Sequence, residues 1–135
     1  KKDVIAVHAV AMRGHCVLMR QRPLNGLWAG LWEFPGTICS QSDPLRTLAV
    51  FLQKSGIRTI KADFFDKITH NYTNHHVTAY FFYIEIDADP LPLHAMASMG
   101  FKFMRCDELT NYAMPSHHRK IAQALQRCTI IHHHT

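Results

Sequence analysis

The apolar pattern at the start of the chain predicts two strands followed by an irregular loop. Residues 4–12 are mostly apolar, with His8 among them, and are typical of a buried strand. Residues 13–15 have the composition of a turn, and residues 16–22 return as the hairpin partner. Residues 22–36, RPLNGLWAGLWEFPG, fit neither a helical nor a strand period, although both tryptophans of the chain lie within them. We expect a loop anchored by large aromatic side chains.

The next periodic segment predicts a helix. Asp43 and Pro44 are typical of a helix N-cap and a first helical position, and Gly56 is typical of a C-terminal cap. Apolar residues between these ends recur at the i, i+3, i+4 and i+7 spacing of a buried helical face: Leu45, Leu48, Ala49 and Leu52. We expect this face to cover a sheet.

Strands and polar breaks alternate in the rest of the chain. Short strands are predicted at residues 57–60, 64–68 and 101–104, and a central strand at residues 77–86, which is apolar on both faces. Residues 69–76 form a polar break between the second and the central of these strands. The pattern therefore places a cluster of polar and aromatic side chains in an exposed loop.

A second helix closes the chain. Asp107 and Ser116 both resemble N-caps, and the helix after Ser116 carries one apolar face: His118, Ile121, Ala122 and Leu125. The order of elements, β-β-loop-helix-β-β-loop-β-β-helix, predicts an α+β domain in which helices flank a mixed sheet.

Composition narrows the function classes. At 135 residues the chain is long enough for one domain with its own core, and its net charge of +5 is modest support for a polyanionic partner. The four cysteines are far apart and form no CxxC pair, so we expect reduced thiols and no zinc ribbon or iron–sulfur site. No apolar run reaches the roughly 18 residues of a membrane span, and we expect no membrane partner. Since residue 1 is not Met, we expect a fragment of a longer protein.

Residues 22–36 resemble the signature of the C-terminal domain of MutY-type adenine DNA glycosylases, a domain with the Nudix (MutT-like) fold. Residues 68–77 resemble the HxFSH loop of that family, and residues 113–120 resemble its closing helix. The resemblance implies a Nudix-like α/β/α sandwich over residues 1–135, with a linker at residues 1–3 and a tail at residues 129–135.

The same resemblance implies a role in base excision repair. The domain would bind double-stranded DNA and read 8-oxoguanine opposite adenine, while the catalytic domain of the same chain removes the adenine. That catalytic domain would precede Lys1 and carry a [4Fe–4S] cluster, so this chain is expected to hold no cofactor, no metal and no catalytic residue. A monomer is expected, in the cytoplasm at the nucleoid if the source is bacterial.

One alternative is a free-standing Nudix hydrolase of oxidised nucleotides such as 8-oxo-dGTP. Such enzymes hold divalent cations on helix carboxylates within a GX5EX7REUXEEXGU box. Counting back from Gly56, the paired glutamates of the box fall on Gln53 and Lys54, and the isolated glutamate, counted from Gly36, falls on Ser42. These substitutions disfavour hydrolysis. A Nudix-derived protein-interaction module is a further alternative.

The resemblance assigns the reading of the lesion to the loop after residue 68. A hydroxyl can accept from N7–H and donate to O8 of 8-oxoguanine, and Thr73 occupies the position of the family's Ser. Tyr72 takes the position of the family's Phe and would stack near the base. His70 matches the leading His and would contact a phosphate or orient the loop. Asn74 departs from the family, which has His there.

Other assignments stay open. His75 or His76 would replace the missing His if the loop shifts, and Arg22 would contact phosphate. Each of these residues has a structural alternative: Thr73 as an ordinary turn hydroxyl, Tyr72 as a core aromatic and His70 as a loop cap. A zinc site is an alternative for one set of side chains, although their spacing matches no standard site: Cys39, His70, His75 and His76. A further set is expected to pack instead: Trp28, Leu31, Trp32 and Phe34. The pair His117 and His118 is expected to contribute to helix surface and packing.

Overall fold

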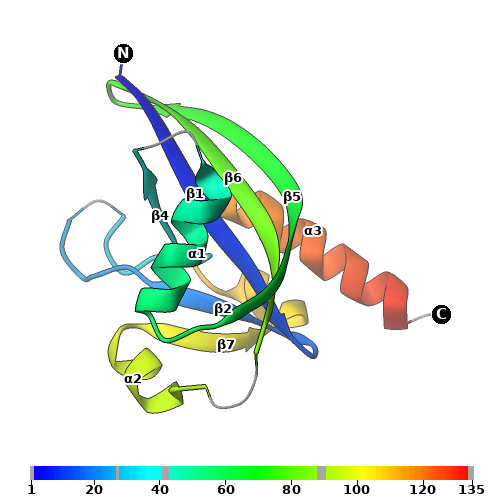
Figure 1. Ribbon diagram of the computed structural model, residues 1–135. Helices are drawn as coiled ribbons and strands as arrows, with labels where there is room; N and C mark the ends of the chain where they lie inside the picture. The colour runs from blue at the N-terminus through cyan, green and yellow to red at the C-terminus, as the bar shows by residue number, and fades with distance from the viewer. Residues whose placement is uncertain (1, 27, 41–42, 88–90, 134–135) are drawn as a thin grey trace.

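One twisted mixed sheet organises the computed structural model, which describes residues 2–26, 28–40, 43–87 and 91–133. Its central path runs in the order β3-β2-β1-β6-β5, while β4 pairs with β1 and β7 pairs with β2. The strands are β1 (Lys2–Arg13), β2 (Cys16–Gln21), β3 (Trp32–Glu33), β4 (Gly36–Cys39), β5 (Thr59–Tyr72), β6 (His75–Ile86) and β7 (Phe101–Arg105). The predicted α+β fold with a mixed sheet between helices is confirmed (Figure 1).

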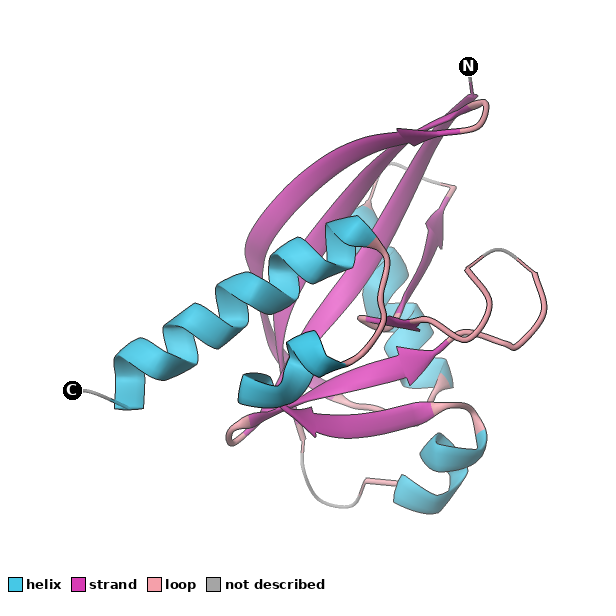
Figure 2. Ribbon diagram, turned by 180° about the vertical axis from the view of Figure 1, so that it is seen from behind, coloured by secondary structure: helices cyan, strands magenta, loops and turns pink. Residues whose placement is uncertain are grey.

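Helices cover both faces of the sheet. They are α1 (Pro44–Lys54), α2 (Leu93–Ser98) and α3 (Ser116–His133), with a 3-10 helix, η1 (Cys106–Asn111), before α3. Figure 1 shows α1 in front of β1, and Figure 2 shows α3 across the opposite face. Among the described residues, no helix is both long and apolar enough to cross a membrane.

Two apolar cores result from the alternation of side chains along β1. Val10 points to the core under α3 with Phe34 and Phe81, whereas Val7 and Ala9 point to the core under α1. The face predicted for the last helix is confirmed, since His118, Ile121, Ala122 and Leu125 are all at most 2% exposed. Residues 6–11 of β1 are therefore buried on both faces of the sheet. In β6, the strand predicted as central, buried residues such as Ala79 and Phe81 alternate with partly buried ones.

The first helix begins and ends where its caps predict. Asp43 accepts a hydrogen bond from the Arg46 N–H at 3.1 Å, and Gly56 follows the helix with φ of +81°. The predicted apolar face was too wide, however. Leu48 and Leu52 are fully buried, but Leu45 and Ala49 are exposed, because α1 contacts the sheet along a stripe of i, i+4 neighbours.

The strands after α1 differ from the prediction in their length. Residues 59–60 of the first predicted short strand and all of the second, 64–68, belong to one strand, β5, which pairs with β6 as far as Tyr72↔His75. Two register shifts, between Thr59 and Lys61 and between Phe64 and Asp66, interrupt its periodicity. Most of the predicted break at 69–76 is strand too, because pairing with β6 satisfies the backbone of polar residues.

Other boundaries also require correction. Lys2 and Asp3 belong to β1 rather than to a linker at residues 1–3, since they pair with His75 and His76. α3 extends to His133, into the tail expected at residues 129–135, of which residues 134 and 135 lie outside the described part.

Asp107 does not cap a helix. Its carboxylate bonds to Arg105 at 2.9 Å, while η1 begins after Arg105 without a side-chain cap. The sequence pattern also missed β3, β4 and α2, which are too short to show a period of their own.

Candidate functional site

The β5–β6 hairpin carries most of the residues that the sequence assigns to the site. Its turn consists of Thr73 and Asn74, both exposed, between the paired residues Tyr72 and His75. Thr73 has φ of +50°, in the left-handed region that β-branched residues rarely adopt. The Thr73 hydroxyl is therefore held at an exposed tip by a backbone conformation that Gly would adopt at lower cost.

Aromatic rings stack along the hairpin behind this tip. The ring centroid of Tyr72 lies 5.4 Å from that of His75 and 5.8 Å from that of His70, and His70 stacks on His117 of α3 at 4.0 Å. Trp28 lies against this array, 5.0 Å from Tyr72 and 5.6 Å from His117. The hairpin is thus anchored on α3 and on the loop after β2 through ring contacts.

A cavity of about 180 Å³ opens between these rings and the sheet. Arg22, Trp28, His70, Tyr72 and His117 contribute its polar and aromatic lining. His8, Glu33 and His118 also line it, and residues of β1, β4 and β6 form the rest: Val4, Ala6, Gly36, Thr37, Ile38 and Val77. Since the His70 Nε2 atom is buried without a hydrogen-bond partner, the cavity presents an unsatisfied polar group.

An ion pair lies at the edge of this cavity. The Arg22 guanidinium lies 3.1 Å from the Glu33 carboxylate, and its Cζ lies 5.8 Å from the Trp28 ring centroid. Desolvation by burial raises the pKa of Glu33, and the nearby Arg22 charge opposes that change. The Arg22 charge is engaged within the fold, so the predicted phosphate contact would require it to serve two anions.

Two buried histidines fix the end of the aromatic loop. The His8 Nδ1 atom lies 2.9 Å from the Phe34 carbonyl oxygen and must donate to it, whereas His118 Nδ1 accepts from the Phe34 N–H at 3.1 Å. Burial lowers the pKa of His8 to about 4 and that of His118 well below 6.5. Both rings are consequently neutral at pH 7 and hold Phe34 through defined tautomers.

The predicted site residues fall into three places. Arg22, His70 and Tyr72 line the cavity, Thr73 and Asn74 form the tip, and His75 lines a neighbouring groove with Tyr72. His76 accompanies them, with its Nδ1 atom 2.8 Å from the Asn71 side-chain oxygen. The hairpin therefore carries all of these predicted residues except Arg22, but it does not bring them into a single pocket.

Sequence reasoning missed several residues of the cavity, among them Trp28 and His117. Trp28 was expected to pack, and His117 to contribute to helix surface and packing, yet both line the cavity. Burial lowers the pKa of His117 to about 3, and the positive character of His70 adds to this effect. The positive φ of Trp28, 54°, marks it as a strained residue, but no sequence pattern signals that conformation. The adjacent pair His117 and His118 was the available signal for the second residue.

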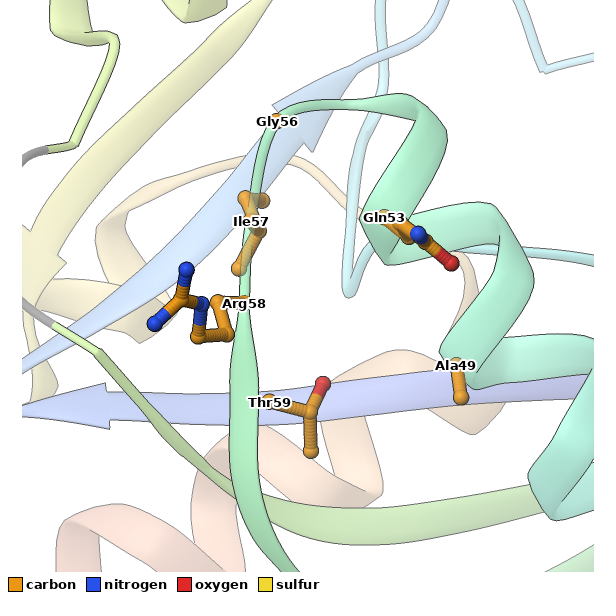
Figure 3. A pocket seen from close by; sticks show the side chains of 6 residues that line it. All are labelled: Ala49, Gln53, Gly56, Ile57, Arg58 and Thr59. Carbon is orange, nitrogen blue, oxygen red and sulfur yellow. The ribbon is translucent and has the colours of Figure 1, made fainter.

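The helix expected to bear metal ligands in a hydrolase presents other groups. Figure 3 shows Ala49 and Gln53 on α1 facing the open pocket that Gly56, Ile57, Arg58 and Thr59 complete. None of these six residues has a carboxylate. Within the described residues, no group of three or more His, Cys, Asp or Glu side chains is arranged to hold a metal ion.

Comparison with known proteins identifies the family. The NUDIX domain model matches residues 6–124 of the chain. The chain belongs to the Nudix family. This Nudix domain is 31% identical over 86 residues to an 8-oxo-dGTP diphosphatase of Proteus vulgaris, a match that covers 62% of the chain and 77% of the relative. It is also 27% identical over 115 residues to an adenine DNA glycosylase of Mus musculus, covering 82% of the chain but only 22% of that longer relative.

Solved structures agree on the fold. A MutT structure from work on Aliivibrio salmonicida and Vibrio cholerae superposes with a TM-score of 0.74 at 17% identity, covering 93% of this chain and 98% of that one. The C-terminal domain of mouse MUTYH, solved in complex with human PCNA, superposes with a TM-score of 0.68 at 22% identity over 93% of this chain and 88% of that one. At these identities the likeness establishes the Nudix fold alone.

Proposed function

We propose that this Nudix domain reads 8-oxoguanine opposite adenine in DNA, as part of an adenine DNA glycosylase that acts in base excision repair. One observation carries the proposal: a β-branched, hydroxyl-bearing Thr73 occupies a strained position at the exposed tip of the β5–β6 hairpin. Residues in sparsely populated backbone regions cluster at functional sites, because selection for stability alone would replace them. Glycine would serve a purely structural turn better.

The chemistry of the lesion fits this group. 8-Oxoguanine differs from guanine by an N7–H donor and an O8 acceptor, and one hydroxyl can satisfy either of them. Asn74 offers a second amide donor and acceptor beside Thr73 at the tip. Tyr72 and His75 flank the tip with aromatic rings that would pack beside a base or sugar. The reading would thus be by binding energy and not by bond cleavage.

The remaining parts of the proposal follow from the resemblance to MutY-type enzymes. A catalytic domain with a [4Fe–4S] cluster would belong to the same polypeptide, and double-stranded DNA containing the lesion would be the ligand. The similarity to a mouse adenine DNA glycosylase over 82% of this chain supports that parentage. The net charge of +5 favours a polyanionic ligand.

Hydrolysis of 8-oxo-dGTP is the second candidate, favoured by the similarity to the Proteus vulgaris diphosphatase. The side chains beside α1 oppose it, because Ala49, Gln53 and Lys54 offer no carboxylate to a divalent cation. We expect no Mg²⁺-dependent release of pyrophosphate from 8-oxo-dGTP by the purified chain above a no-protein control. Release that a single substitution in α1 abolishes would overturn the proposed function.

The direct test concerns Thr73. In the full-length enzyme, Thr73→Ala should reduce discrimination between 8-oxoG:A and G:A duplexes by about 1 kcal/mol, roughly fivefold in relative Kd, which is the net worth of one hydrogen bond. Thr73→Ser keeps the hydroxyl and should retain discrimination. If Thr73→Ala discriminates normally while Tyr72→Ala does not, the assignment of the reading residue is wrong. If deletion of the whole domain changes nothing, a protein-interaction module is the better description.

A further inference from the structure

The tip of the hairpin has a main-chain neighbour in the first residues of β1. Lys2 and Asp3 run parallel to the start of β6, in the register Lys2↔His75 and Asp3↔His76. The Lys2 N–H donates to the carbonyl oxygen of Asn74 at 2.8 Å, which places this bond within the turn itself. Both Figure 1 and Figure 2 show the start of β1 beside the β5–β6 turn.

The neighbours of β1 on its other edge begin further along the strand. Pairing with β4 starts at Ile5↔Cys39, and pairing with β2 lies at the far end, at Met12↔Val17. Lys2 and Asp3 thus support the tip through β6 and also border a groove of about 580 Å³, opposite Tyr72 and His75. Of the described strands, only β1 and β5 pair with β6.

We propose that residues 2–4 are a positioning strand for the lesion-reading tip, in which the Lys2 N–H fixes Asn74 and, through it, Thr73. The proposal rests on the reading function proposed above and adds a residue that acts through the backbone. In the two-domain enzyme, the polypeptide would enter this domain directly beside the tip. The segment that joins the domains and the loop that reads the lesion would then be held by one hydrogen-bonded strand.

The physical reason lies in the geometry of the turn. Thr73 is held at positive φ, a conformation that persists only where surrounding structure determines it. Hairpin ends otherwise open locally, since few contacts secure them. A hydrogen bond to the Asn74 carbonyl restrains the peptide plane that follows Asn74 and so limits the directions in which the neighbouring Thr73 hydroxyl can point. Directional contact with one base requires this restraint.

Proline substitution separates this backbone role from side-chain effects. Lys2→Pro removes the N–H that Asn74 accepts, whereas Lys2→Ala removes the same charge and keeps the N–H. Asp3→Pro is the matched control, because successive N–H groups of a strand point to opposite edges and that of Asp3 points away from β6. Ile86→Val, at the far end of β6, controls for a modest loss of global stability.

We expect Lys2→Pro to reduce discrimination between 8-oxoG:A and G:A in the full-length enzyme as strongly as Thr73→Ala, about fivefold. Lys2→Ala, Asp3→Pro and Ile86→Val should keep wild-type discrimination. In the 135-residue chain, amide exchange of His75 and His76 should accelerate only in Lys2→Pro. Wild-type discrimination by Lys2→Pro, alongside a defect in Thr73→Ala, would overturn the positioning role and leave the reading function standing. If Thr73→Ala itself keeps wild-type discrimination, the proposed reading function is wrong instead.

Discussion

At the scale of single residues, strain marks the site. Among the described residues, Trp28 and Thr73 are the two non-glycine residues with positive φ. Thr73 lies in the turn of the β5–β6 hairpin, and Trp28 lies in the loop between β2 and β3, where its ring contacts Tyr72 of the hairpin. Trp28 is held by ring contacts with Tyr72 and His117, while Thr73 lies exposed at the turn. Such conformations cost about 1–3 kcal/mol each, so both residues lower the stability of the fold.

Replacing Thr73 by glycine should make the protein more stable. Thr73→Gly relieves the left-handed strain, and after the greater unfolded-state entropy of glycine is subtracted, we expect a gain of about 0.5–1 kcal/mol in the free energy of unfolding. Urea unfolding followed by tryptophan fluorescence would measure it. Thr73→Ala keeps the strained φ but loses the β-branch, so it should gain less than Thr73→Gly. A loss of stability in Thr73→Gly would show that the Thr73 side chain contributes to the fold.

At the scale of elements, the short strand β4 decides the shape of the cavity. It pairs with β1 from Ile5↔Cys39 to His8↔Gly36, and thereby brings Gly36 and Ile38 to the cavity wall. A Cβ at Gly36 would collide with the Val7 carbonyl oxygen and with the His8 ring. Close approach of two backbones, rather than positive φ, is why glycine is required at this position.

Gly36→Ala should therefore destabilise the domain by about 3 kcal/mol or more, since neither the β1 backbone nor the buried His8 ring can move freely. Chemical denaturation measures this loss. Gly26→Ala is the control: no atom lies within 4 Å of its added Cβ, and only its φ of +93° is unfavourable. We expect a cost of about 1 kcal/mol there. Equal costs at the two positions would contradict the close packing of β4 on β1.

At the scale of the whole molecule, neutral histidines connect β1, α3 and the β5–β6 hairpin. His8 of β1, Phe34 and His118 of α3 form one hydrogen-bonded unit, and His117 extends it to the hairpin through His70. Burial keeps these rings uncharged, because a protonated ring would be poorly solvated there. Protonation would also place like charges within a few ångströms of one another. The stability of the fold is therefore expected to depend on pH.

Stability should fall as the pH is lowered from 7.5 to 5. The pKa of His8 is about 4 in the folded state and 6.5 in the unfolded chain, so the unfolded chain binds more protons between these values. His8 alone would lower the free energy of unfolding by about 2 kcal/mol at pH 5. Glu33, whose pKa is raised, acts in the opposite direction. Urea titrations at both pH values test this, and His8→Gln should show a flatter dependence; a wild type equally stable at both would refute it.

The sequence by itself determined the elements whose signals are local. The caps of α1, the buried face of α3 and the apolar β6 follow from residue spacing, and residues 22–36 indicated the Nudix family through a contiguous motif. The resemblance of residues 68–77 to the same family's loop also indicated the hairpin residues of the candidate site, whose role stays a prediction.

Only the tertiary structure decided how distant segments meet. The pairing of β4 with β1, the extension of β5 through a polar segment and the parallel bond from Lys2 to Asn74 depend on backbone hydrogen bonds between residues far apart in the chain. Trp28 and His117 became cavity residues for the same reason, because their ring contacts join a loop, a hairpin and a helix. Sequence periodicity reports which face of an element is apolar, but it carries no information on which other element that face or edge will contact.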